Sequence, residues 1–364
     1  MLPKLPKAQM VRVAFAIPGD INRPTGGYAY DRKVLARLGA AGVEATHFPL
    51  PGSFPYPEAA DVAHVIETLQ ALPADAVVLF DGLAYGAMPA SAIARVAQPI
   101  VALCHHPLAL ETGLDAAQQS YFRSTEVEAL AMARHVVVTS KTTRRCLISE
   151  YAVPEAKVTV AEPGTERGAR ARSNDSRLRL LAVGSIIPRK GYRYLIEALS
   201  EVPDRQWHLT IVGSLADNTT VAEVGAAITS ADLVRHVELR GALPSADLAG
   251  LYAGSDIFVL PSLYEGYGMV LAEAMAHGLP IVSTTGGAAA ETVPDSAALK
   301  VPPADAKALA CAIGRLISDH DLRHHMAAAS WQAGLSLPTW DDTTRIIAAV
   351  LSAIGRNTEN LDRT

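Results

Sequence analysis

Cysteine is scarce in this sequence, and its few residues show no spacing that binds a metal. Cys104, Cys146 and Cys311 are the three cysteines of the 364-residue chain, and no CxxC pair occurs. The absence of such pairs argues against a zinc cage and against a disulfide framework. We therefore expect reduced thiols, as in the cytosol.

A long apolar run is also lacking. No stretch reaches the ~18 uncharged apolar residues that a membrane-spanning helix needs. Near the N-terminus, Lys4 and Lys7 precede the apolar residues 11–17, but Arg12 interrupts this run and Pro18 ends it. A first β-strand explains the pattern better than a signal peptide. We expect a cytoplasmic protein, with peripheral attachment at the inner face of a membrane left open.

An excess of basic charge is missing as well. The 32 Lys and Arg are outnumbered by 37 Asp and Glu, which gives a formal net charge of −5 and argues against a nucleic-acid partner. Basic residues gather at two places, which are Arg167, Arg170, Arg172, Arg177 and Arg179, and Arg134, Lys141, Arg144 and Arg145. We expect a solvated surface here; weak contact with anionic lipids is the alternative.

What the chain does have is a regular alternation of short apolar runs with helical patterns. Strands are predicted at residues 11–17, 76–80, 100–104 and 136–139, and again at 178–183, 207–212, 236–239, 257–260 and 280–283. The polar residues 164–179 between the two series predict a linker. The fold class is therefore α/β, with two Rossmann-like doubly wound parallel sheets that face a cleft.

This pattern also predicts the division into domains. We expect one Rossmann-like domain over residues 1–165 and a second over residues 176–345. Residues 346–364 are expected to form a helix or tail that returns to the first domain.

The most informative segment lies at residues 257–280, where a strand, a glycine-bearing loop and a helix follow one another. The first helical turn, at Gly268, Met269 and Val270, offers free N–H groups to an anion such as a diphosphate. Glu265 in the loop and Glu273 in the helix can each accept hydroxyl hydrogen bonds, which suits sugars and ribose.

This segment closely resembles the Glu-x7-Glu motif of glycosyltransferase family 4, including its flanking Pro-Ser, Glu-Gly and Ala-His-Gly-Leu-Pro. The resemblance implies that Glu265 contacts the donor sugar and that Glu273 holds the ribose hydroxyls. The structural alternative is a solvated loop residue and a charge that caps the helix.

Residues 184–191 resemble the phosphate-binding loop of the same family. Many members carry an arginine directly after Gly184, where this chain has Ser185. The resemblance assigns the anion-binding role to Arg189 and Lys190, which together offset the charge of a leaving diphosphate. An ordinary surface pair at a helix start is the alternative.

Two loops of the first domain resemble family elements. Gly26 and Gly27 join the opening strand to a helix, where the family places a loop beside the diphosphate and the acceptor; an ordinary turn is the alternative. His105 and His106 follow the strand at 100–104, where members usually have a histidine. The resemblance favours His105 over His106 for the donor-sugar pocket.

Two weaker patterns occur towards the end of the chain. Glu291, after the glycines at 286–287, is expected either to touch the donor or to cap its helix. Asp319-His320-Asp321 superficially matches a metal-binding Asp-x-Asp string, but its helical context predicts a helix N-terminus. No metal and no cofactor are expected.

The resemblance implies the GT-B architecture, with the first domain on the acceptor side and the second binding the nucleotide sugar. It also implies a metal-independent enzyme that retains anomeric configuration. It would move a hexose from a nucleotide diphosphate sugar, of the UDP-glucose or GDP-mannose type, to an acceptor hydroxyl. Glycolipid or cell-envelope polysaccharide synthesis is expected, with a lipid-linked, polysaccharide or small-molecule acceptor. Tyr56, Tyr85 and Tyr121 are candidates for the acceptor side.

Two other functions fit the same architecture. A sugar-nucleotide epimerase would convert the donor without an acceptor, and a noncatalytic subunit would only bind it. A dehydrogenase fits poorly, because neither opening strand is followed by Gly-x-Gly-x-x-Gly.

Overall fold

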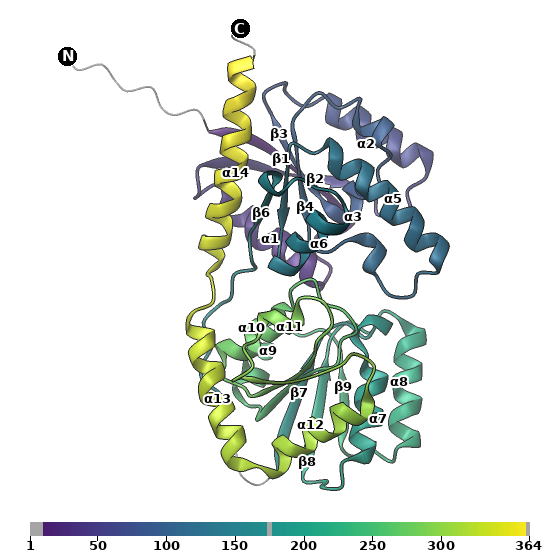
Figure 1. The fold of residues 1–364 in the computed structure, drawn as a ribbon, viewed down its shortest axis with the longest axis vertical. Coiled ribbons are helices and arrows are strands. Elements are labelled where there is room, and N and C mark those ends of the chain that lie inside the picture. Colours follow the sequence, from purple (N-terminus) through teal and green to yellow (C-terminus); the bar gives the residue numbers. More distant parts are fainter. Residues whose placement is uncertain (1–9, 173–176, 362–364) are drawn as a thin grey trace, which may run out of the picture.

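Two six-stranded parallel sheets form the frame of the protein over residues 10–172 and 177–361, which the computed structural model describes (Figure 1). The first sheet has the order β2-β1-β3-β4-β5-β6, and the second has the order β12-β11-β10-β7-β8-β9. Helices flank both sheets. The predicted α/β class with two doubly wound parallel sheets is confirmed.

The first half of the molecule, residues 10–164, holds the first sheet. Its strands are β1 (Val11–Pro18), β2 (Val43–Leu50), β3 (Val77–Asp81), β4 (Ile100–Cys104), β5 (His135–Val138) and β6 (Val158–Val160). Its helices are α1 (Gly26–Leu38), α2 (Ala59–Gln70), α3 (Gly82–Tyr85), α4 (Ala90–Ile93), η1 (Leu108–Leu110), α5 (Ala116–Met132), α6 (Lys141–Glu150) and η2 (Glu155–Lys157). The central strands β3 and β4 are buried along their whole length, which explains their continuous apolar sequences.

The second half, residues 177–335, holds the second sheet. Its strands are β7 (Leu178–Val183), β8 (Trp207–Val212), β9 (Val237–Arg240), β10 (Ile257–Leu260), β11 (Ile281–Thr284) and β12 (Ala298–Val301). Its helices are η3 (Pro188–Lys190), α7 (Tyr192–Glu201), α8 (Asn218–Ser230), α9 (Ser245–Ala253), α10 (Met269–Ala276), α11 (Ala289–Thr292), α12 (Ala306–Ser318) and α13 (His320–Leu335).

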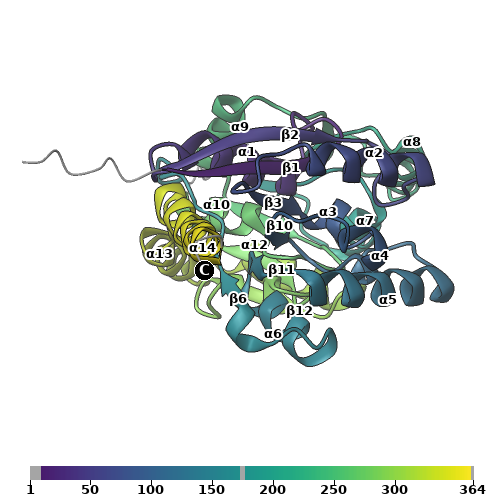
Figure 2. The ribbon, with the colours of Figure 1, turned by 90° about the horizontal axis from the view of Figure 1, so that it is seen from above.

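The last helix, α14 (Trp340–Leu361), leaves the second half and lies along the first (Figures 1 and 2). It packs against α1 and β1, and Trp340, Ile347 and Leu351 join the same buried cluster as Phe15. The chain thus crosses between the halves twice. The two crossings lie side by side, since the amide of Thr165 donates to the carbonyl of Pro338 at 2.8 Å.

No helix within residues 10–172 and 177–361 is both long and apolar enough to cross a membrane.

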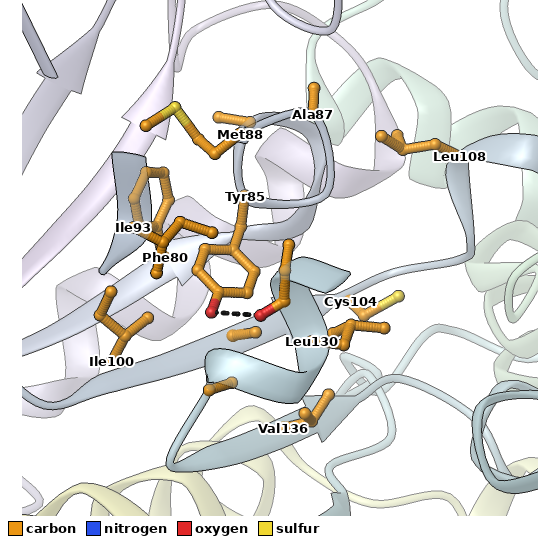
Figure 3. Close-up of a cluster of buried hydrophobic side chains, with 14 of the residues drawn as sticks. Phe80, Tyr85, Ala87, Met88, Ile93, Ile100, Cys104, Leu108, Leu130 and Val136 are labelled. Atoms are coloured by element: carbon orange, nitrogen blue, oxygen red, sulfur yellow. Dashed lines mark hydrogen bonds between the residues drawn. The ribbon is translucent and has the colours of Figure 1, made fainter. Parts of the chain in front are cut away.

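A buried core of the first half contains Tyr85, which we expected from the sequence on the acceptor side of the site. Tyr85 is fully buried among apolar side chains such as Phe80 and Leu130, and its hydroxyl donates to the carbonyl of Ala129 at 2.7 Å (Figure 3). The expectation that Tyr85 lines the acceptor side is therefore wrong. Its phenol serves packing, because a buried hydroxyl needs a partner and finds one in α5.

Candidate functional site

A cavity of about 800 Å³ lies where the two halves face each other. Its walls include the segments that follow β1, β4, β7 and β10. All four segments leave the carboxyl ends of parallel strands, where open α/β sheets bind their ligands. The cavity is therefore the candidate site.

The start of α10 forms one wall of this cavity. Gly268, the residue that caps the helix, has φ +88° and ψ 57°, a left-handed conformation that favours glycine. The turn directs the first helical residues, Met269 and Val270, to the cavity. Amides of a first helical turn have no partner within the helix, so this end of α10 is suited to an anion.

Lys190 and Glu265 meet on the wall of the cavity that the second half provides. The Lys190 ammonium donates to Glu265 Oε1 at 2.5 Å, and Glu265 Oε2 lies 3.8 Å from Arg189 Nη1. Burial raises the pKa of Glu265, but the charges of Lys190 and Arg189 outweigh burial and lower it. Glu265 is therefore an ionised acceptor held beside two cations.

Arg189 also reaches across the cavity. Its Nε lies 2.9 Å from Oε1 of Glu111, which belongs to the loop after η1 in the first half. The other oxygen of Glu111 lies 3.3 Å from His106 Nε2. Burial raises the pKa of Glu111, yet the His106 hydrogen bond and the Arg189 charge lower it to about 2.

Glu273 lies further along α10 and also lines the cavity. The hydroxyl of Tyr252, in α9, donates to Glu273 Oε2 at 2.8 Å. Burial raises the pKa of Glu273 to about 6, although the Tyr252 hydrogen bond lowers it. This carboxylate is thus placed on the cavity wall in the first half of α10, close to the helix N-terminus.

The wall of the first half comes from α1 and from the end of β4. Thr25 caps α1 by accepting from the amide of Tyr28 at 3.4 Å. His105 lies beside Gly27, and its Nε2 lies 3.2 Å from Asp31 Oδ1 and 3.4 Å from Asp81 Oδ2. The structure brings both His105 and His106 to the cavity.

Most of the residues that the sequence predicts for the site line this one cavity. They are Gly26, Gly27, His105, Gly184, Ser185, Arg189, Lys190, Glu265, Gly268, Met269, Val270 and Glu273. Glu291 is not among the residues that line it. Its carboxylate is about half exposed and pairs with Arg145 of α6, so it joins the two halves outside the cavity.

The string at 319–321 also has a clear structural place. The side chain of Asp319 accepts from the amide of Leu322 at 2.9 Å and so caps α13. This is the helix N-terminus that the sequence predicts.

Four residues of the site have no counterpart in the sequence analysis. Asp81 ends the apolar run of β3, so the rule that strand ends carry function points to it. Asp31 follows Gly27 by one helical turn, which places both on one face of α1. Glu111 and Tyr252 carry no sequence signal, because a loop and a separate helix bring them to the site.

Comparison with known proteins agrees with this geometry. A family model described as "Glycosyl transferase 4-like domain" matches residues 7–164, and one described as "Glycosyl transferases group 1" matches residues 177–319. Two facing parallel sheets with such a cavity define a GT-B-type glycosyltransferase fold. The chain belongs to the group 1, family-4-like glycosyltransferases.

The chain is also similar to known glycosyltransferases over part of its length. The chain is 28% identical over 266 residues to the MMP α-(1→4)-mannosyltransferase of Mycolicibacterium hassiacum, covering 66% of this chain and 64% of the relative. It is 32% identical over 200 residues to the D-inositol 3-phosphate glycosyltransferase of Corynebacterium jeikeium, covering 50% of this chain and 48% of the relative. The matched region thus spans between about half and two thirds of these relatives.

Solved structures share the fold over nearly the whole chain. Anabaena HepE in complex with UDP and glucose superposes with a TM-score of 0.75 at 19% identity, covering 94% of this chain and all 100% of that one. WaaG, a glycosyltransferase involved in lipopolysaccharide biosynthesis, gives 0.74 at 17% identity and covers 93% and 99%.

Proposed function

We propose that this protein is a retaining, metal-independent hexosyltransferase that uses a nucleotide diphosphate sugar. The observation that carries the proposal is the single cavity that joins Lys190, Glu265, Glu273 and the start of α10. The group combines cations for a diphosphate with carboxylates for sugar hydroxyls. Such a set suits a donor whose leaving group is an anion.

The reaction proposed for these positions retains the anomeric configuration, as the resemblance to family 4 implies. The bond between the anomeric carbon and the phosphate oxygen breaks, and its electron pair goes to the diphosphate. Lys190, Arg189 and the first amides of α10 stabilise the charge that develops there. The acceptor hydroxyl attacks from the same face and gives its proton to the departing phosphate oxygen. Glu265 orients the donor sugar, and Glu273 accepts from the ribose hydroxyls.

The acceptor is proposed to enter from the side of the first half. Tyr56 is 57% exposed and lines the cavity, with its ring centroid 5.3 Å from that of buried Phe122. Leu83, Leu108 and Leu114 also line this part. An exposed aromatic ring on an apolar wall suits the face of a sugar or a lipid stem, which fits an acceptor used in glycolipid or envelope polysaccharide synthesis.

A thermal-shift screen of UDP and GDP sugars tests the donor. A donor at 100 times its Kd stabilises the protein by about 2.7 kcal/mol, which raises Tm by several degrees. Binding by neither nucleotide class would contradict the proposal. A donor that is found should then be incubated alone, because product formed without an acceptor would indicate an epimerase.

The anomeric outcome and the metal requirement have their own tests. Proton NMR of the transferred sugar should show the anomer of the donor, and an inverted product contradicts retention. Turnover should be unchanged after treatment with a chelator, since the cations at the diphosphate position are protein side chains.

A further inference from the structure

Three side chains from three elements of the first half meet at one ring nitrogen. Nε2 of His105, after β4, lies 3.2 Å from Oδ1 of Asp31 in α1 and 3.4 Å from Oδ2 of Asp81 at the end of β3. The Asp31 side chain has 0% of its surface exposed and that of Asp81 has 4%, whereas His105 keeps 19% and lines the cavity. The carboxylates thus support a ring that a ligand can reach.

The charges of this group favour a protonated ring. Buried carboxylates are stable only when other charges or hydrogen bonds compensate them, and a neutral imidazole would supply a single proton to two of them. Burial alone lowers the pKa of His105, but the charges and hydrogen bonds of Asp31 and Asp81 raise it to about 10. The pKa of Asp31 is raised to about 7, mainly by burial.

Two uncharged side chains also lie next to His105. From α1, the ring of Tyr30 lies edge-on with its centroid 5.2 Å away. Directly after β5, Thr139 donates to the carbonyl of His105 rather than to its ring. His106 is paired with Glu111, which occupies a different part of the loop.

The position of His105 places it between the two halves. A Cβ atom on Gly27 would lie 3.5 Å from Cδ2 of His105, and one on Gly266 would lie 2.5 Å from its carbonyl oxygen. Gly266 directly follows Glu265. Because Gly266 has no side chain, the loop of the second half that carries Glu265 can touch His105 at the end of β4. A donor held by Glu265 therefore lies next to His105.

The protonation state decides what His105 offers to that donor. In the neutral form with hydrogen on Nε2, the other nitrogen, Nδ1, is an acceptor. In the imidazolium, both nitrogens carry hydrogen. Because the aspartates occupy Nε2, Nδ1 is the nitrogen that is left for a ligand.

We propose that Asp31 and Asp81 are positioning residues that keep His105 an imidazolium, so that its Nδ1 donates a hydrogen bond to an oxygen of the bound nucleotide sugar. This inference rests on the proposed function for the identity of the ligand. The recognised atom is an oxygen with a free lone pair, from a donor hydroxyl or from the diphosphate.

A divalent cation is the competing occupant of these three side chains. Their ligand atoms lie within 4.8 Å of one another, close enough to surround an ion. Ligation needs the lone pair of Nε2 and therefore a neutral ring. The two arrangements exclude each other, which makes the charge of the ring the decisive measurement.

Nitrogen-15 NMR of histidine-labelled protein measures that charge without turnover. The His105 signals, assigned by their loss in His105→Gln, should remain those of an imidazolium up to about pH 9. In Asp31→Asn the same signals should change to those of a neutral ring at a lower pH, because one compensating charge is gone. A neutral ring at pH 7.5 in the unaltered protein overturns the proposal, whatever reaction the protein catalyses.

Turnover and metal binding give two further readouts. For Asp31→Asn, kcat/KM should be near normal at pH 6 and about tenfold lower at pH 8.5, the scale of one charge-assisted hydrogen bond. Asp75→Asn, a carboxylate paired with Arg12 away from the cavity, should keep the normal profile. An equal loss at both pH values, or calorimetric Mn²⁺ binding that Asp31→Asn abolishes, contradicts the proposal.

Discussion

Glu111 and Arg189 form an ion pair that joins the two halves across the cavity, with 2.9 Å between Glu111 Oε1 and Arg189 Nε. Arg189 belongs to the loop that is proposed to hold the donor's diphosphate. In this structure, therefore, a carboxylate of the opposite half satisfies the cation that the ligand would use. A bound diphosphate has to compete with Glu111 for this guanidinium.

Replacing Glu111 with glutamine should consequently tighten the binding of a nucleoside diphosphate. We expect Kd to fall about threefold, the scale of a partly exposed ion pair. Isothermal titration calorimetry measures this directly. The matched control is Glu155→Gln, whose carboxylate pairs with Arg144 on the surface. Unchanged or weaker binding in Glu111→Gln would show that the pair does not oppose the ligand.

Lys190→Ala should lower turnover by one to two orders of magnitude. The ammonium is proposed to stabilise the leaving diphosphate, and a charge-assisted hydrogen bond of about 1.5–3 kcal/mol corresponds to that loss. Steady-state kinetics with the identified donor tests it. Arg193→Ala removes an exposed cation of α7 and should leave the rate within about twofold. Near-normal activity of Lys190→Ala contradicts the assigned role.

Glu265→Ala should separate nucleotide binding from transfer. Its carboxylate is proposed to contact the donor sugar, so calorimetry with the nucleoside diphosphate alone should give nearly normal affinity while transfer is lost. The isosteric Glu265→Gln tests whether transfer is lost because the charge is gone or because alanine leaves an empty space beside Lys190. Loss of nucleotide binding in both variants would instead exchange the roles of Glu265 and Glu273.

The strands that the sequence did not predict share one structural property. β2, β6 and β12 each lie at the edge of a sheet. An edge strand is covered on fewer sides, and β2 is buried only at its two ends, Val43 and Leu50, instead of forming a continuous apolar run. Strands at the centre of a sheet, such as β3 and β4, produce the apolar runs on which the prediction depended.

The residues of the site also fall into two groups, those that the sequence indicates and those that only the fold brings together. Lys190, Glu265 and Glu273 lie in contiguous motifs, so the sequence could point to them before any fold was known. Their convergence depends on how two loops 75 residues apart meet. Glu111 comes from a loop without a motif, and only the packing of the two halves brings it to Arg189.

Glu291, which the sequence led us to expect either at the donor or at a helix cap, lies outside the cavity. Because its carboxylate pairs with Arg145 outside the cavity, Glu291→Gln should leave the Kd of a nucleoside diphosphate within about twofold. Calorimetry at low salt, where surface charges act most strongly, provides the sharpest test. A tenfold loss of affinity would show that Glu291 does contribute to donor binding.

Glu273 should make donor affinity depend on pH. Its pKa of about 6 means that the carboxylate is ionised above this value and protonated below it. The ionised form accepts strongly at both oxygens, whereas the protonated form carries an O–H donor and accepts more weakly, so affinity should rise as the pH increases through about 6 and fall below it. A nucleotide sugar is the better ligand here, because its diphosphate has no titration of its own in this range.

Tyr252→Phe provides the check on this assignment. The variant removes the hydrogen bond that lowers the pKa of Glu273, so the midpoint should move to higher pH. At pH 7 the donor should bind several-fold more weakly, while at pH 8.5 the two proteins should agree within about twofold. Tyr121→Phe, which changes an exposed tyrosine, should keep the original midpoint. A loss of affinity that is the same at every pH would mean that Tyr252 acts through packing and that Glu273 does not set the pH dependence.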